Sequence, residues 1–520
     1  MSRGFDRCEA GNASASQVHV TSGKLALQAR HQDTMKLLGR ANYREDARKM
    51  VKANGGRSLQ ALVDEKSNLV EYFHNDTLAP HYRARTGLTA AFIPPEFTNW
   101  RDEQRAWRES AILFDQSHHM PELMLRGPDA FRLLEKLGIN SLANFTIDRA
   151  KQFVACTPRG HVIGDCVVYR LAEDLFELIS GMPVLNWVQY NAEAGGYDVT
   201  IERDDPTPYN PTGRRWFYRF QLEGPNAGLI FNEVVEGGAP EIAFFRTAKV
   251  KIDGCNVLVL RHGMAGHLGA ELSGPYEDME KVRAAFLRAG KKHGLKQGGT
   301  KTYFSTIFEF GWMPYPLPGI YTGEELRGFR EWLSGNGWEA NAQLGGSFVS
   351  DNIEDYYVTP WDLGYGHILK FDHDFVGREA LEATAAEKRR QKVTLVWNRD
   401  DVAAIFASAL GDGPRYKAID LPVAYYGWPQ FDEVCSLDGA LVGHSCHCGY
   451  SNNEGEMLSL AMLSTPSAAP GTEVTITWGE PGGGSRKPHV ERHQQFKVRA
   501  VVAPVPYASS VQKMKRAAIS

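Results

Sequence analysis

The spacing of apolar residues changes from every second position to a helical repeat between residues 122 and 138. Leu123 and Leu125 recur at alternate positions, which predicts a half-buried strand that stops at a Gly-Pro pair. Apolar residues then occupy positions 131, 134 and 137, and a glycine at 138 ends the predicted helix. After an Arg-Gly turn, Val162, Cys166 and Val168 share one face of a further predicted strand. This region therefore mixes α and β structure.

Two later regions also carry clear patterns. Residues 275–294 predict a helix with an apolar stripe, which begins after a proline and ends at a glycine. Beyond residue 390, the runs KVTLVW, EVTITW and FKVRAVV alternate and are separated by Gly- and Pro-rich turns, a pattern typical of a compact antiparallel barrel or sandwich. These patterns predict an α+β fold whose C-terminal part is an antiparallel barrel or sandwich.

These patterns divide the chain into four predicted parts. Residues 1–85 form an N-terminal helical extension, and residues 86–388 alternate between strands and helices. Residues 389–508 form the barrel domain, and residues 509–520 are a tail.

Composition favours an ordinary enzyme over several other classes. Among 520 residues, 58 Lys and Arg face 62 Asp and Glu, so the net charge is only −4 and no basic stripe suggests nucleic-acid binding. No apolar run reaches the roughly 18 residues of a membrane span, and the first residues lack the apolar core of a secretory signal. Seven scattered cysteines fit reduced thiols better than a disulfide framework. We expect a cytoplasmic protein that binds neither membranes nor nucleic acid.

Two short motifs allow other chemistry. In an unbroken strand His444, Cys446 and Cys448 would share one face, and such ligands hold zinc or copper. Three ligands in one row do not converge on a tetrahedral ion, so buried thiols and no metal are expected. The loop GEPGGGSRKP could hold an anion through its glycine amides and Arg486, but it lacks the strand-to-helix setting of a phosphate loop, and a hairpin turn is expected.

Four longer blocks occur in a fixed order along the chain. They are FQLEGPNA, LRHGMAGHLGAELSGPYE, DLGYGHILKFDHDFVGREALE and GYSNNEGEMLSLAML. In this order they resemble the glycine-cleavage T-protein (aminomethyltransferase) superfamily over residues 90–505. The resemblance implies two intertwined α/β subdomains that bind folate, over residues 86–388, followed by the barrel.

A narrower resemblance rests on NWRDEQRAWRESAILFDQSHHM, GGSFVSDNIEDYYVTPWDLGYG and FEFGWMPYPLPGIYTG. These segments are similar to the tetrahydrofolate-dependent aromatic O-demethylases of the vanillate/3-O-methylgallate and syringate types. Such enzymes move the methyl group of a lignin-derived aryl methyl ether to N5 of tetrahydrofolate, giving a phenol and 5-methyltetrahydrofolate. The expected enzyme is therefore a methyltransferase with tetrahydrofolate and a small aromatic acid as its partners.

The resemblance also assigns residues to the reaction. Phenolate is a poor leaving group, so the enzyme must align N5 with the methyl carbon and stabilise the departing oxygen. The matched positions are His119, which hydrogen-bonds at the aromatic substituents, and Tyr303, which lies near the methyl-transfer centre. This displacement needs no metal. His118, beside His119, is expected to be structural.

Cofactor and substrate residues follow from the same resemblance. A carboxylate accepts the adjacent amino and ring N–H groups of a pterin, and Glu271 matches the glutamate that does so. Gln221 and Trp312 are expected to contact the same cofactor. The predicted substrate-binding residues are Gln116, Ile179 and Gly181.

The chain departs from the vanillate type on the substrate side. Gly181 stands where that type has the arginine that holds the aromatic carboxylate, and Leu88 and Ala90 replace tyrosines. A glycine would open space for a second methoxy group, which favours syringate. Arg83 or Arg85 could hold the acid instead, and vanillate, 3-O-methylgallate or a chlorinated methoxybenzoate remain alternatives.

Two other functions within the same superfamily are an aminomethyltransferase and a non-catalytic folate-binding protein. A glycine-cleavage aminomethyltransferase has an aspartate soon after a VVNAGN-like strand, and that residue is missing from LISGMPVLNW. A non-catalytic folate-binding protein of the iron–sulfur assembly kind carries a KGCYxGQ signature, which is absent. The sequence allows a monomer or a homodimer.

Overall fold

The computed structural model describes residues 56–77, 92–207, 209–210, 214–263, 269–387, 389–426, 429–488 and 490–513. The chain forms two compact units, Met1–Gly56 and Arg57–Ser520. The second unit begins with α3 (Leu59–Glu65) and α4 (Leu69–Asn75), which fall within the predicted N-terminal extension. Arg83, Arg85, Leu88 and Ala90 lie outside the described residues. The predicted boundaries at residues 85, 388 and 508 stay predictions.

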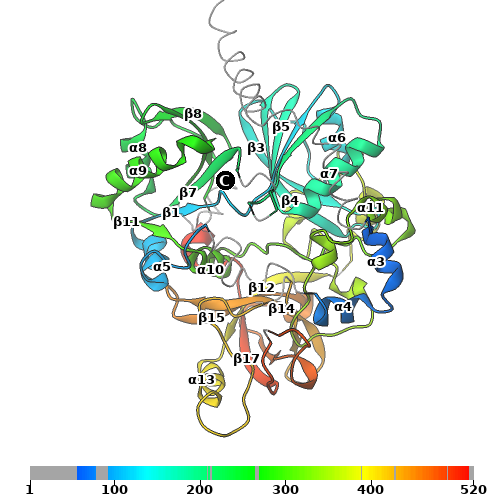
Figure 1. Cartoon of the computed structure of the whole chain (residues 1–520). Helices are drawn as coiled ribbons and strands as arrows, with labels where there is room; N and C mark the ends of the chain where they lie inside the picture. The colour runs from blue at the N-terminus through cyan, green and yellow to red at the C-terminus, as the bar shows by residue number, and fades with distance from the viewer. Residues whose placement is uncertain are drawn as a thin grey trace, which may run out of the picture. The chain divides into compact units, whose positions relative to one another are not determined.

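Two sheets form the first part of the second unit (Figure 1). Sheet one is mixed, because β1 pairs in parallel with β11 while its other neighbouring strands are antiparallel. Its strands lie in the order β11 (Leu295–Gly298), β1 (Ala111–Asp115), β7 (Phe217–Glu223), β10 (Ala270–Pro275), β9 (Cys255–Arg261) and β8 (Thr247–Ile252). Sheet two is antiparallel, in the order β3 (Arg149–Cys156), β4 (Val162–Ala172), β5 (Leu175–Ser180), β2 (Glu122–Arg126) and β6 (Thr200–Asp204).

A closed antiparallel barrel follows and lies below the two sheets in Figure 1. Its strands lie in the order β12 (Arg390–Trp397), β15 (Glu456–Ser464), β14 (Leu441–Ser451), β13 (Asp432–Cys435), β16 (Glu473–Trp478) and β17 (Phe496–Ala503). The helices after α4 are α5 (Trp100–Glu109), α6 (Ala130–Leu137), α7 (Met182–Ala194), α8 (Ala227–Val234), α9 (Met279–Gly290), α10 (Thr300–Phe310), α11 (Arg327–Trp332), α12 (Arg378–Ala383) and α13 (Arg399–Ser408).

The predicted α+β fold and its C-terminal barrel are confirmed. β2 buries both Leu123 and Leu125 completely, and α6 ends at Gly138 as its spacing predicted. α9 buries its apolar stripe and leads through a short 3-10 turn to Gly294, whose φ of 74° is a left-handed conformation that glycine adopts without strain. Local sequence patterns therefore specified these elements correctly.

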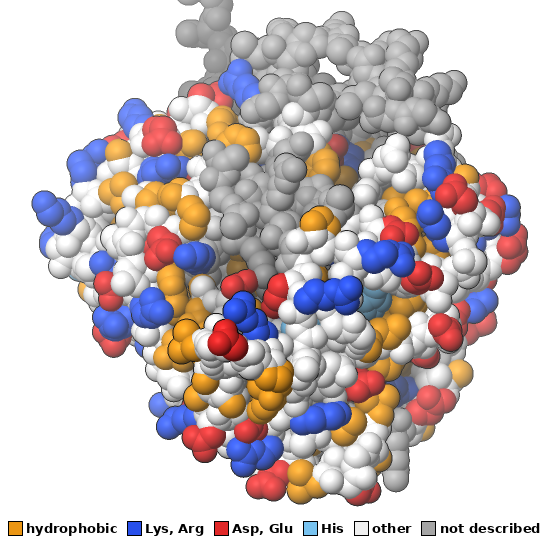
Figure 2. Space-filling view, turned by 60° about the horizontal axis from the view of Figure 1, so that its bottom comes forward, with side chains coloured by type: hydrophobic (Ala, Val, Ile, Leu, Met, Phe, Trp, Pro, Cys, Tyr) orange, Lys and Arg blue, Asp and Glu red, His pale blue; other side chains and the backbone are white. Residues whose placement is uncertain are grey.

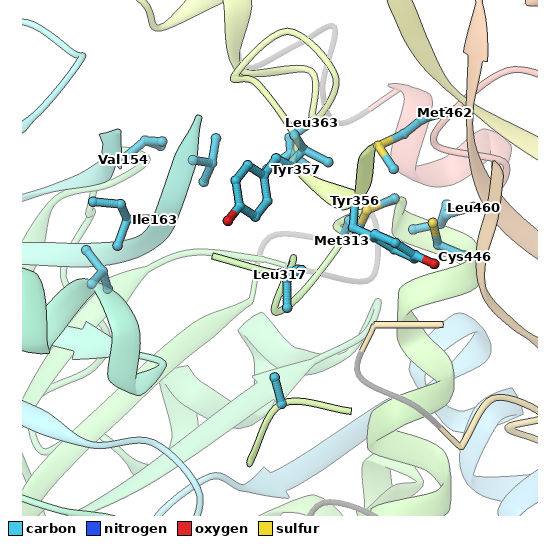
Figure 3. Packing of buried hydrophobic residues seen from close by; sticks show 14 of the residues in the cluster. Val154, Ile163, Met313, Leu317, Tyr356, Tyr357, Leu363, Cys446, Leu460 and Met462 are labelled. Carbon is cyan, nitrogen blue, oxygen red and sulfur yellow. The ribbon is translucent and has the colours of Figure 1, made fainter. Parts of the chain in front are cut away.

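The apolar core is continuous between sheet two and the barrel, whereas sheet one has a separate core with α8 and α9. Figure 3 shows the shared core, in which Val154 and Ile163 of sheet two and Leu460 and Met462 of the barrel are joined by residues of the segment around Leu317. A small third group, Ala150, Tyr169 and Ile179 of sheet two with Leu260 of sheet one, connects the two sheets. The space between the sheets is thus bounded by two separate cores.

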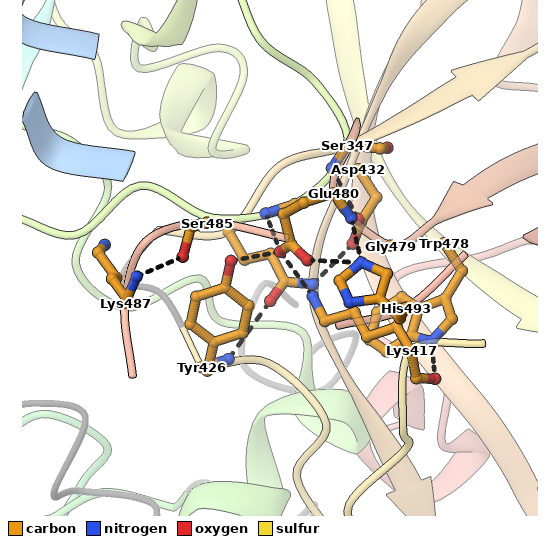
Figure 4. A network of polar contacts seen from close by, with 12 residues as sticks. Ser347, Lys417, Tyr426, Asp432, Trp478, Gly479, Glu480, Ser485, Lys487 and His493 are labelled. Atoms are coloured by element: carbon orange, nitrogen blue, oxygen red, sulfur yellow. Dashed lines mark hydrogen bonds and ion pairs between the residues drawn. The ribbon is translucent and has the colours of Figure 1, made fainter. Parts of the chain in front are cut away.

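A buried polar network lies among the loops that connect the barrel strands and is drawn in Figure 4. The ammonium group of Lys417 donates to Glu480 Oε1 at 2.8 Å, and the Tyr426 hydroxyl bonds to the same carboxylate. Since these buried groups are paired with one another, their role is structural.

On the surface, Figure 2 shows basic and acidic side chains interspersed, with apolar side chains between them. No described helix is both long and apolar enough to cross a membrane.

Candidate active site

The chain crosses between the two sheets twice, and polar residues gather at these crossings. The first crossing, residues 116–121, leads from β1 of sheet one to β2 of sheet two. The second crossing, residues 205–216, leads from β6 of sheet two back to β7 of sheet one. His119 lies in the first crossing and Arg215 in the second.

A chain of hydrogen bonds starts at His119 and ends inside sheet one. His119 Nε2 lies 3.2 Å from the hydroxyl oxygen of Tyr303 in α10, and Gln116 Nε2 donates to that oxygen at 3.3 Å. Gln116 Nε2 also donates to Gln221 Oε1 at 2.9 Å, and Gln221 Nε2 donates to Glu223 Oε1 at 2.5 Å. We call these five residues the His119 chain. Four of them are predicted site residues, so folding has joined positions that are far apart in the sequence.

The His119 chain borders a small recess. His119 and Tyr303 form its wall together with Phe114 and Asp115 of β1, and its empty volume is about 250 Å³, including space open to solvent. Gln116 Oε1 is buried and has no hydrogen-bond partner among the described residues, which leaves an acceptor for a ligand.

Within the wall, His119 and Tyr303 are both uncharged near neutral pH. Burial lowers the pKa of His119 to about 3, and the nearby charges of Arg215 and His118 act in the same direction. Burial raises the pKa of Tyr303 well above its ordinary value, so the phenol keeps its proton. Because Gln116 donates to the Tyr303 oxygen, the tyrosine hydrogen can point to His119 Nε2 or into the recess, depending on the imidazole tautomer.

One buried arginine faces three carboxylates where the sheets meet. Arg219 Nη2 of β7 donates to Glu122 Oε1 at 3.2 Å and to Glu177 Oε1 at 3.1 Å. Glu271 Oε2 lies 3.9 Å from Arg219 Nη1 and accepts the Tyr169 hydroxyl at 3.2 Å. We call these five residues the Arg219 cluster. One guanidinium cannot balance three ionised carboxylates, and burial makes such an excess of charge costly.

A proton on Glu177 relieves this excess. Burial raises the pKa of Glu177 to about 7; the Arg219 charge opposes that rise and the Glu122 charge adds to it. Glu271 is the cross-strand neighbour of Gln221 in the β10–β7 pairing, so the Arg219 cluster adjoins the His119 chain. His262 Nε2 is 3.9 Å from Glu271 Oε1, beyond hydrogen-bond reach, which leaves that oxygen available to a ligand donor.

Trp312 belongs to a separate group of residues. Its indole N–H lies 3.0 Å from the Tyr365 hydroxyl and 3.3 Å from Asp165 Oδ2, and the Tyr365 hydroxyl donates to Asp165 Oδ2 at 2.7 Å. Burial raises the pKa of Asp165, and hydrogen bonds from Tyr365 and Trp312 oppose the rise. The polar edge of Trp312 is therefore occupied by protein groups, and only its ring faces remain for stacking.

Gly181 does not open the space that the sequence suggested. A Cβ atom at this position would lie 2.7 Å from Cε1 of Tyr315, so the tyrosine ring already fills the volume beside the glycine. Tyr315 has a φ of 51°, a left-handed conformation that costs a non-glycine residue on the order of 1 kcal/mol. Ile179, two residues earlier, is buried and packs in the group with Tyr169 and Leu260 that connects the sheets.

Sequence reasoning missed Arg215, Arg219, Glu177, Asp165 and Tyr315. Two of them carried a usable signal, because Arg219 in FYRFQLE and Glu177 in LFELIS are charged residues inside otherwise apolar strands. A charge in a buried strand is normally paired, and such pairs mark polar sites. The signal does not say which charges meet, since Arg219 and Glu177 lie on different sheets.

The other residues that the sequence singled out are His118, the HSCHC run and Arg486, and none of them belongs to the His119 chain or the Arg219 cluster. His118 Nδ1 lies 3.0 Å from Thr207 Oγ1, and its ring stacks on Phe92, which agrees with a structural role. β14 contains a bulge between Ser445 and Cys448, so the alternation that would place the HSCHC side chains on one face is broken. No group of three metal-ligating side chains occurs in the part of the chain that the structure describes. Arg486 pairs with Glu71 of α4 and with Asp76, which follows the helix.

Known proteins resemble the chain over most of its length. Residues 68–316 match the GCVT N-terminal domain. Syringate O-demethylase of Sphingobium sp. is 46% identical over 453 residues, which are 87% of this chain and 96% of that protein. Sesamin methylene transferase of Sinomonas sp. is 31% identical over 432 residues, 80% of this chain and 90% of that protein.

A solved structure shares the fold. Glycine cleavage system aminomethyltransferase T from Bartonella henselae aligns with a TM-score of 0.55 at 17% sequence identity, over 80% of this chain and 92% of that one. At this level of identity the likeness concerns the architecture alone.

Proposed function

This chain belongs to the GCVT family, and from that premise we propose that it demethylates a methoxylated aromatic acid, with tetrahydrofolate as the methyl acceptor. Syringate is the first candidate substrate. The observation that carries the proposal is the 46% identity to syringate O-demethylase, which extends over 96% of that protein. The products are a phenol and 5-methyltetrahydrofolate.

The reaction requires two coordinated changes. The bond between the methyl carbon and the ether oxygen breaks while a bond forms between that carbon and nitrogen, and one proton passes from the nitrogen to the phenolic oxygen. Tetrahydrofolate supplies the nucleophilic N5. Tyr303 provides a hydroxyl donor at the recess, and the uncharged imidazole of His119, 3.2 Å away, orients that hydroxyl by a hydrogen bond. Hydrogen bonding to the departing oxygen lowers the barrier because phenolate leaves poorly.

Two residues of the two adjoining groups fit a pterin. The Glu271 carboxylate accepts a pair of neighbouring N–H donors, a geometry in which charge-assisted hydrogen bonds are strong. Gln221 lies opposite Glu271 in the sheet. Trp312 offers a ring face to the cofactor, because its N–H is held by the Asp165 and Tyr365 pair.

On the substrate side, the ring of Tyr315 lies against Gly181, where the vanillate type would place a cation. In our proposal Gln116, whose buried Oε1 has no partner among the described residues, and Ile179 also contact the aromatic substrate. The protein then holds the aromatic acid by ring packing and neutral hydrogen bonds at this position.

We place the enzyme in the cytoplasm, because cells keep reduced folates inside, and expect it to act as a monomer or homodimer. Size-exclusion chromatography with light scattering distinguishes the two states.

A substrate panel tests the function directly. The purified protein is incubated with tetrahydrofolate and, separately, with syringate, vanillate, 3-O-methylgallate and a chlorinated methoxybenzoate, and 5-methyltetrahydrofolate is followed by chromatography. Syringate should give the highest kcat/KM. Absence of methylated folate with every substrate contradicts the proposed function, whereas methylation with another member of the panel contradicts only the choice of syringate.

A further inference from the structure

A single guanidinium joins the two crossings between the sheets. Arg215 Nη1 donates to the carbonyl oxygen of Ser117 at 2.7 Å, and Nη2 donates to that of Met120, also at 2.7 Å. These two carbonyls flank His119, so the arginine in the second crossing binds the first crossing on both sides of the imidazole. The backbone N–H of Thr207 adds a bond to the carbonyl of His118 at 3.1 Å.

The other edge of the guanidinium is fixed as well. Arg215 Nε donates to Asp204 Oδ2 at 2.8 Å, and the same oxygen accepts the backbone N–H of Trp216 at 2.8 Å. Asn210 Nδ2 holds the second oxygen of Asp204 at 2.9 Å. The side chains of Arg215 and Asp204 are each 1% exposed. A planar group with three directed bonds and no access to water leaves the turn around His119 little freedom.

The charge of Arg215 also acts on His119. It is the largest electrostatic contribution, after burial itself, that keeps the His119 pKa low. The other ionisable groups near the imidazole are Tyr303 of α10, His118 and Asp115 of the β1 segment, and Asp204 behind the arginine. Asp115 is itself paired with Arg283 of α9 at 2.5 Å. The charges of Arg215 and Arg283 both act on His118, whereas on His119 the arginine that acts is Arg215.

We propose that Arg215 is a positioning residue for the methyl transfer: it fixes the turn that carries His119 between the two sheets by binding the backbone on both sides of the imidazole. This inference rests on the proposed function, because it assumes that the His119 and Tyr303 pair serves the reaction. The second crossing, through Arg215, thus orients the turn that joins β1 of sheet one to β2 of sheet two.

Three variants separate geometry from charge. Arg215→Lys keeps the cation but reaches at most one of the two carbonyls. The double variant Arg215→Gln with Asp204→Asn removes the cation and leaves a neutral buried pair, which limits the risk of misfolding. The matched control is Arg390→Gln with Asp362→Asn, because Arg390 also binds one aspartate and the backbone, here the single carbonyl of Tyr357, outside the site.

The expected results differ between variants. In both Arg215 variants kcat should fall at least about tenfold, while KM for tetrahydrofolate changes less than about threefold, because misplacing a catalytic group acts mainly on the chemical step. The control should keep the wild-type kcat. In the protein without substrates, NMR titration of ¹³C-labelled histidine should show a higher His119 pKa in the double variant than in Arg215→Lys.

Other results would overturn the proposal. If both Arg215 variants keep kcat within about twofold, or if kcat and KM change together as they do in a general loss of folding, Arg215 does not position His119. An equal His119 titration in the two variants would show that the charge of Arg215 does not act on His119. The NMR measurement needs no turnover, so it still tests whether Arg215 acts on His119 even if the wild-type protein fails to demethylate any substrate.

Discussion

Glu177→Gln should make the protein more stable at alkaline pH. In the folded state the buried carboxyl has its pKa raised from an ordinary value of 4.5 to about 7, chiefly by burial. Below pH 4.5 both folded and unfolded states hold the proton, so the group adds no pH dependence. Between 4.5 and 7 only the unfolded state ionises, and folding stability falls as the pH rises. Above pH 7 the loss is complete.

The size of the effect follows from the shift. A rise of about 2.5 pKa units corresponds to about 3 kcal/mol at 1.36 kcal/mol per unit. Glutamine has nearly the same shape and no proton to lose, so Glu177→Gln should gain up to this amount at pH 8 and little at pH 4. The hydrogen bond that Glu177 accepts from Arg219 can be made by the amide oxygen, which keeps the arginine in place.

Thermal and urea unfolding of both proteins at pH 5 and pH 8 measures the difference. Glu473→Gln, at an exposed position of β16, is the control for the loss of one negative charge, and it should show no gain that grows with pH. The reasoning fails if Glu177→Gln is no more stabilising at pH 8 than at pH 5, or if it destabilises at pH 8.

Three further predictions concern catalysis and binding. Tyr303→Phe removes the hydroxyl donor of the recess and should lower kcat about 100-fold with KM for tetrahydrofolate unchanged; steady-state kinetics that show a full kcat would remove Tyr303 from the mechanism. Glu271→Gln loses the anionic acceptor and should weaken tetrahydrofolate binding about 10- to 100-fold by calorimetry; unchanged affinity would place the pterin elsewhere. Gly181→Ala puts a carbon 2.7 Å from the Tyr315 ring, and we expect KM for syringate to rise about tenfold while KM for tetrahydrofolate stays constant; a constant KM for syringate would show that Tyr315 does not border the substrate.

Local periodicity was sufficient for elements whose determinants are neighbours in the sequence. β2, α6, α9 and the barrel strands β12, β16 and β17 were predicted in this way, because alternation and helical spacing reflect which face of each element is buried. The strand pattern around His444 predicted strict alternation, which was wrong because a bulge inserts an extra residue between Ser445 and Cys448, and the sequence carries no signal for it.

Contacts across the fold could not be derived from such patterns. The resemblance selected His119, Tyr303, Gln116 and Gln221, but only the fold shows that they form one chain of hydrogen bonds. For Gly181 the sequence indicated empty space, whereas a residue 134 positions later in the chain, Tyr315, occupies it. Whether a glycine leaves empty space beside it depends on which residues, remote in the sequence, pack against that position.

The two crossings have a consequence for the order in which the protein becomes active. Because the ribosome releases the chain from the N-terminus, His119 emerges long before Tyr303, which follows 184 residues later. Sheet two, residues 122–204, is synthesised entirely between the two crossings, but the apolar core that it buries also contains residues of the barrel, which are synthesised last. A chain that ends between the second crossing and α10 would therefore contain the His119 turn without Tyr303 and without the barrel side of that core. Full-length synthesis is a condition for the chemistry.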